Sequence, residues 1–114
     1  MKKVLASICI GMFLGNALLW ASSGHGAQTD QGKSLYEQKC QICHGANGKG
    51  DGPAAGAFNP GPADFTKPDF WHGKVQKITE TLRKGKGGMP AFTLTDDEIK
   101  AITDYLTQTF KGQN

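Results

Sequence analysis

Apolar residues recur at helical spacing in two segments of the chain, residues 74–84 and residues 95–110. Positions three, four and seven residues apart lie on one face of an α-helix, so this pattern predicts two amphipathic helices that pack against a core. The apolar face of the first helix consists of Val75, Ile78 and Leu82. That of the second consists of Ile99, Ile102, Leu106 and Phe110, with Tyr105 beside it.

Capping residues mark the ends of these two helices. Gly85 follows the first helix, and glycine commonly ends a helix because it adopts the left-handed conformation without strain. Thr95 and Glu98 form a capping box at the start of the second helix. Asp96 and Asp97 lie in its first turn, where negative charge is favourable.

Residues 30–40 predict a third helix. Asp30 is a suitable N-cap, and Leu35 and Tyr36 supply an apolar face. Gly32 lies one turn before Tyr36, and it is either a weak point in the helix or the place where another helix approaches closely.

The segment 45–68 predicts a long loop, because it contains turn-forming dipeptides and four prolines that disfavour regular structure. A loop of this length in a compact domain is normally functional or disordered. Phe58, Phe65 and Phe70 argue against disorder, since such side chains need a surface to pack on. No strand pattern or repeat is visible, so the predicted fold class is all-α, with three main helices and long loops in one domain at residues 30–114.

The first 23 residues predict a secretory signal peptide that is removed from the mature chain. Lys2 and Lys3 precede an apolar run at residues 4–20, and small residues follow it. The alternative is an uncleaved membrane anchor, although a helix over residues 4–20 would span only about 26 Å of a bilayer core of roughly 30 Å. Cleavage leaves residues 24–29 as a short linker and predicts a periplasmic protein with no membrane segment.

Without the signal peptide the chain is nearly neutral. The full sequence carries 13 basic and 10 acidic residues, and removal of Lys2 and Lys3 leaves 11 basic residues and a net charge of +1. This balance excludes the strongly basic surface of a nucleic-acid-binding protein.

A glycine-rich domain of about 90 residues buries a small core, and it often needs further stabilisation by a metal or a bound group.

The sequence Cys-X-X-Cys-His at residues 40–44 is the attachment signature of a c-type haem. The spacing places the thiols of Cys40 and Cys43 about one helical turn apart, where they form thioether bonds with two haem vinyl groups. His44 then lies beneath the iron as its proximal ligand.

Two other functions of this motif fit the sequence less well. A zinc site needs further ligands, and outside the motif only His25 and His72 remain as nitrogen donors, with no second cysteine pair. A thioredoxin-like dithiol needs a strand before the motif, whereas the segment before Cys40 predicts a helix. The sequence therefore predicts one covalently bound haem c, and we expect the haem-free chain to be poorly folded.

Met89 is the predicted ligand on the opposite face of the iron. It is flanked by Gly87, Gly88 and Pro90, so it lies on a tight loop rather than in a helix. A thioether suits haem iron and raises its reduction potential. The alternatives are His72 or no sixth ligand, and a lone histidine is more often a surface residue.

With these features the chain resembles the class I monohaem c-type cytochromes. Besides the Cys-X-X-Cys-His motif, the residues that carry the resemblance are Gly32, Tyr36, Gly88, Met89, Pro90, Ile102, Tyr105 and Leu106. In that family the first and last helices cross, so the resemblance implies that Gly32 and Tyr36 contact the last helix. Their expected partners there are Ile102, Tyr105 and Leu106.

The resemblance also implies contacts around the haem. In the family a proline carbonyl accepts the Nδ1 proton of the proximal histidine and fixes the ring orientation, and Pro60 or Pro62 is the candidate here. Trp71 either donates its indole N–H to a haem propionate, as in some relatives, or packs against the haem edge.

The function that follows is that of an exported electron carrier in a respiratory chain. Because His44 and Met89 would occupy both axial positions, the iron would change oxidation state without binding a substrate, so the chain is predicted not to be an enzyme. The alternatives are a haem c subunit of a larger oxidoreductase complex, and a haem enzyme or gas-binding protein with a labile sixth ligand.

Redox proteins, such as a reductase, an oxidase or a dehydrogenase, are the expected partners of a monomer that binds no nucleic acid. Basic residues gather just before Met89, at Lys74, Lys77, Arg83, Lys84 and Lys86. They form either a docking surface for an acidic partner or an ordinary solvated helix face.

Overall fold

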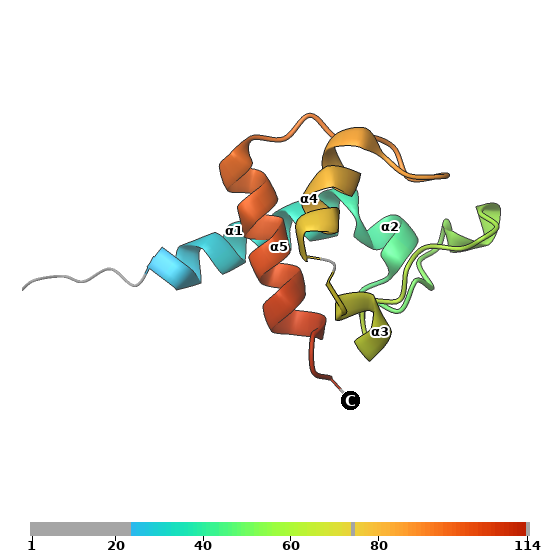
Figure 1. The fold of residues 1–114 in the computed structure, drawn as a ribbon, viewed down its shortest axis with the longest axis horizontal. Helices are drawn as coiled ribbons and strands as arrows, with labels where there is room; N and C mark the ends of the chain where they lie inside the picture. The colour runs from blue at the N-terminus through green and yellow to red at the C-terminus, as the bar shows by residue number, and fades with distance from the viewer. Residues whose placement is uncertain (1–23, 74, 114) are drawn as a thin grey trace, which may run out of the picture.

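The computed structural model describes residues 24–73 and 75–113, and the predicted signal peptide or anchor lies outside them. Within this part of the chain the structure is helical and contains no β-strand, which confirms the all-α fold class (Figure 1). Its elements are α1 Gly24–Lys39, α2 Gln41–His44, the 3-10 helix η1 Ala55–Ala57, α3 Pro68–Trp71, α4 Val75–Lys84 and α5 Asp96–Phe110. None of these helices has the length and apolar character that crossing a membrane requires.

The first and last long helices, α1 and α5, cross at Gly32 (Figure 1). A Cβ atom on Gly32 would overlap the carbonyl oxygen of Ala101 and lie 2.8 Å from Cβ of Tyr105. Gly32 is therefore the site of close helix approach rather than a weak point in α1. The expected contact with Tyr105 is confirmed, and the backbone of Ala101, which was not predicted, is its nearest neighbour.

Aromatic rings fill the core beneath this crossing. The ring of Tyr36 lies 5.4 Å from that of Tyr105 and 5.5 Å from that of Phe110, measured between centroids. Tyr36, Ile102 and Phe110 are almost completely buried. Burial of this apolar area is the main source of stability that the chain itself supplies.

Within the described residues helix α1 extends from Gly24, upstream of the predicted start at Asp30, so residues 24–29 are helical rather than a linker. Contacts with α5 explain the difference. Lys100 Nζ donates to Gln28 Oε1 at 3.3 Å, and Thr29 Oγ1 donates to Gln108 Oε1 at the same distance. These long-range contacts support helical turns that the local sequence does not specify.

The capping box predicted for α5 and the glycine stop predicted for α4 are both present. Thr95 Oγ1 accepts from the backbone N–H of Glu98, and the Glu98 carboxylate accepts from the N–H of Thr95, so the capping box at α5 is confirmed. Gly85 has a φ of 73° directly after α4, and its N–H donates to the carbonyl of Thr81. This is the left-handed stop that the sequence predicts.

The loop after His44 contains more regular structure than predicted. It includes η1, and Pro68 at its end begins the one-turn helix α3. Proline favours the first turn of a helix, where its fixed φ fits and its missing N–H is not needed. The expectation of no regular structure was therefore wrong at both places. Backbone bonds from Gly52 to Cys43 and from Ala54 to Ile42 fold the loop back onto α2.

Candidate haem-binding site

Cys40 is the N-cap residue of α2, and the rest of the Cys-X-X-Cys-His motif forms the single turn of this helix. The carbonyl of Cys40 accepts from the N–H of Cys43 at 3.1 Å and from that of His44 at 2.9 Å. Neither cysteine forms a disulfide; Cys40 is buried and Cys43 is partly exposed. Burial raises the pKa of Cys40 to about 11, whereas redox-active dithiols have lowered pKa values. The setting therefore disfavours a thioredoxin-like function.

His44 is buried and held from two sides. Its ring stacks on that of Phe65, with centroids 4.4 Å apart and an angle of 17° between the planes. Its Nδ1 lies 3.1 Å from the carbonyl oxygen of Ala63, which accepts the proton of that nitrogen. Burial lowers the pKa of His44. The neutral ring is thus fixed with Nε2 as its acceptor nitrogen, the arrangement that a metal-binding histidine needs.

The carbonyl at Nδ1 corrects the expectation that Pro60 or Pro62 supplies it. The Pro62 carbonyl faces Gly50 instead, where a Cβ atom would overlap its oxygen and lie 3.2 Å from its carbon. The N–H of Gly50 in turn donates to the carbonyl of His44. This local fold of the loop presents the next carbonyl, that of Ala63, to the histidine ring.

A cavity of about 940 Å³ lies beside α2 and is lined by all four residues predicted to hold the haem, Cys40, Cys43, His44 and Met89. Helices α4 and α5 supply an apolar wall. The residues of this wall are Ile78, Leu82, Ile102 and Leu106. Its size lies near the upper end of the range of about 300–1,000 Å³ for ligand sites, and its lining is mainly apolar.

Met89 lies on a tight turn at the edge of this cavity. Lys86 and Met89 exchange two backbone hydrogen bonds of 3.0 Å each. Gly87 has a φ of 58° between them, which glycine adopts without strain. The half-buried side chain of Met89 is therefore carried on a defined turn, as the neighbouring glycines and proline predicted.

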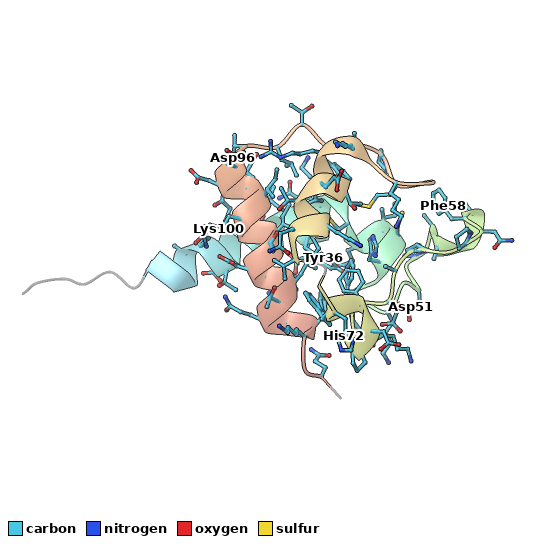
Figure 2. All side chains as sticks on the ribbon, viewed as in Figure 1. Tyr36, Asp51, Phe58, His72, Asp96 and Lys100 are labelled. Atoms are coloured by element: carbon cyan, nitrogen blue, oxygen red, sulfur yellow. The ribbon has the colours of Figure 1, made fainter. Side chains whose placement is uncertain are left out.

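His72 and Trp71 contribute nothing to the cavity. His72 is exposed after α3 at the lower edge of the molecule (Figure 2), so the alternative of His72 as a ligand is not supported. Trp71 is buried, and its indole N–H donates to the carbonyl of Phe65 at 2.8 Å. Its indole donor is thus occupied and it does not line the cavity, so the structure supports neither the propionate bond nor packing against the haem edge.

The basic residues before Met89 separate into two groups. Arg83 pairs with Asp96, and Lys84 pairs with Glu80 at 3.0 Å. Lys77 and Lys86 instead line the cavity, together with Lys39, whereas Lys74 lies outside the described residues. Lys39 was not predicted, because it lies far from the others in the sequence.

No group of three or more histidine, cysteine, aspartate or glutamate side chains converges within residues 24–73 and 75–113 in the way that a protein metal site requires. Two thiols, one imidazole and one thioether around an apolar cavity are the donor set of a c-type haem instead.

The chain matches the family model described as cytochrome c oxidase, cbb3-type, subunit III, over residues 27–106. It belongs to the class I c-type cytochromes. Haem c is therefore its cofactor, and the residues around the cavity fit that group. Haem-based electron transfer is the general function of this cytochrome.

Several known proteins are similar in sequence to this cytochrome, and the aligned region makes up a different fraction of each of them. Cytochrome c6 of Tetradesmus obliquus is 31% identical over 83 residues, which are 71% of this chain and 90% of that protein. The cbb3-type cytochrome c oxidase subunit CcoP of Azospirillum brasilense is also 31% identical over 83 residues, 70% of this chain and 28% of that protein. Thiosulfate dehydrogenase of Psychrobacter arcticus is 38% identical over 93 residues, 69% of this chain and 25% of that protein. The chain thus spans only about a quarter of the two larger relatives.

Proposed function

We propose that this cytochrome is an exported electron carrier whose haem is bound through Cys40 and Cys43, with His44 and Met89 as the axial ligands. The observation that carries the proposal is that these four side chains, from α2 and from the turn after α4, line one apolar cavity. A bound haem supplies one-electron chemistry there.

The surroundings of the proposed ligands favour fast electron transfer. Phe65 and the Ala63 carbonyl fix the ring of His44, and two backbone bonds fix the turn of Met89. Ligands held in this way move little between oxidation states. The apolar walls would exclude water from the iron of a bound haem and so would favour its reduced form.

Lys39, Lys77 and Lys86 are proposed as the docking surface for a redox partner. All three line the cavity that would hold the haem, so a partner bound over them would approach the cofactor. Positive charge at this position steers an acidic protein surface toward the haem. The partner is thus expected to be a reductase, oxidase or dehydrogenase with an acidic contact surface, bound by a monomeric cytochrome.

Optical spectroscopy of the exported protein tests the ligation. A ferric haem with a methionine ligand shows a weak sulfur-to-iron charge-transfer band in the far red, and a ferrous haem with both axial sites filled does not bind carbon monoxide. We expect the band and no carbon monoxide binding at neutral pH. A missing band together with rapid binding would refute Met89 as a ligand and favour a gas-binding protein or haem enzyme.

A haem subunit of a larger complex is the second candidate, because the family model and CcoP both name oxidase subunits. Purification of the tagged protein without detergent separates the two functions. A carrier elutes as a monomer free of stoichiometric partners, whereas a subunit co-purifies with its complex.

N-terminal sequencing of the exported protein tests the proposed periplasmic location. Cleavage near residue 23 is expected, and a chain that begins at Met1 in the membrane fraction would establish the anchor instead.

A further inference from the structure

Phe58 and Gly88 join the two loops that border the haem cavity. Phe58 follows η1 in an extended conformation, and Gly88 precedes Met89 on the turn after α4. A Cβ atom on Gly88 would overlap Cδ1 of Phe58 and lie 2.7 Å from its Cε1. Figure 2 shows Phe58 at the end of its loop, close to the turn. The ring therefore packs directly on the backbone of Gly88.

This contact requires a glycine for space rather than for conformation. Gly88 does not have the positive φ of its neighbour Gly87, so an alanine would be conformationally acceptable there. A methyl group at Gly88 would meet the ring of Phe58, which would have to move to make room for it. The large side chain of Phe58 on one loop thus packs against the backbone of Gly88 on the other, where no side chain lies between them.

The contact between Phe58 and Gly88 lies next to Met89, whose bond to the haem iron is expected to be the weakest at the site. A thioether is a neutral ligand, and its bond to iron opens when the loop that carries it moves. The turn 86–89 is tied to itself by the two bonds between Lys86 and Met89. A contact with the opposite loop limits movement of the turn as a whole. Phe58 and Gly88 both line the cavity, so the contact acts at its wall.

We propose that Phe58 is a positioning residue for Met89, and that its ring, packed on Gly88, holds the turn 86–89 closed over the iron. This role rests on the proposed His44 and Met89 ligation. Loss of the contact would leave the haem attached and the histidine bound, but would increase the fraction of molecules in which the methionine has left the iron.

Four holo-protein variants test this role: Phe58→Ala, Gly88→Ala, both together, and Gly56→Ala as the control. A methyl group at Gly56, on the same loop as Phe58, meets nothing within 4 Å. The measurements are the intensity of the far-red sulfur-to-iron band of the ferric form and the rate of carbon monoxide binding to the ferrous form.

We expect Phe58→Ala and Gly88→Ala each to weaken the band and to raise the binding rate about tenfold, the size of effect expected from loss of one packed aromatic contact. In the double variant the methyl group enters the space that the ring has left. Gly88→Ala should therefore add less than about a twofold change in the Phe58→Ala background. Gly56→Ala should match the wild type.

Phe58→Leu distinguishes positioning from general destabilisation, since leucine keeps an apolar side chain over Gly88 and should restore most of the band. A wild type without the band overturns the ligation itself. A wild type with the band, together with a Phe58→Ala variant that keeps it and binds no carbon monoxide, overturns only the role of Phe58. Additive effects of Phe58→Ala and Gly88→Ala also overturn it.

Discussion

The hydroxyl of Tyr36 donates a 2.6 Å hydrogen bond to the carbonyl of Gly45. Tyr36 belongs to the crossing of α1 and α5, and Gly45 directly follows His44 at the end of α2. The bond therefore connects the helix crossing to the motif that holds the haem. Burial raises the pKa of Tyr36, so the hydroxyl keeps its proton throughout the physiological range and remains a donor.

Replacement of Tyr36 by phenylalanine should destabilise the holo-protein by about 0.5–1.5 kcal/mol, because it removes the shorter of two hydrogen bonds to the Gly45 carbonyl, which would keep only the N–H of Gly48 at 3.2 Å. Tyr105→Phe is the matched control, since it removes a hydroxyl from the neighbouring ring of the same core. Thermal unfolding followed by circular dichroism measures both variants. Equal losses of stability in the two would show that the bond to Gly45 has no special importance.

Two glycines of α1 should respond to alanine in opposite directions. At Gly32 the new methyl group would overlap the backbone of Ala101, and overpacking of this kind costs about 1–3 kcal/mol. At Gly26 it would meet nothing within 4 Å, and alanine in a helix is more stable than glycine by about 0.5–1 kcal/mol.

Urea unfolding of Gly32→Ala and Gly26→Ala gives the two free-energy changes with one method. A stabilised Gly32→Ala variant would contradict the close crossing of α1 and α5. A destabilised Gly26→Ala variant would contradict the placement of Gly26 within a regular, exposed helix.

The parts of the fold that the sequence predicted correctly depend on local signals. Thr95 and Glu98 cap α5 through contacts three residues apart, and Gly85 ends α4 through its own φ. The start of α1 could not be predicted from such local signals. Asp30 has the side chain of an N-cap, yet the helix continues upstream because Gln28 and Thr29 contact residues on α5.

At the haem-binding site, too, local features could be predicted from the sequence, whereas long-range contacts could not. The spacing of Cys40, Cys43 and His44 predicts their neighbouring positions on one helical turn. The carbonyl that orients His44 depends instead on the path of a long loop, in which the Pro62 carbonyl lies against Gly50 and the Ala63 carbonyl faces the ring. A residue type alone does not reveal such a partner, because every residue has a carbonyl group.

Absence of haem should leave the chain without a stable fold. The walls of the 940 Å³ cavity include core residues of α4 and α5, and without the cofactor these apolar side chains would face water or a void. A domain of this size has little other core to compensate. We expect Cys40→Ser/Cys43→Ser protein, isolated without haem, to have low helicity and no cooperative transition on heating. Native helicity with a sharp melt would refute this.

Reversal of charge at the cavity should change the electron-transfer rate with small charged reagents. Lys77→Glu and Lys86→Glu replace positive charge beside the proposed haem edge. Each should slow reduction by an anionic complex such as hexacyanoferrate(II) by several-fold to about tenfold at low salt, and the difference should shrink as salt screens the charges. Lys111→Glu, an exposed residue after α5 that does not line the cavity, is the control. Equal slowing in all three variants would mean that net charge, rather than the position of these lysines, governs the encounter.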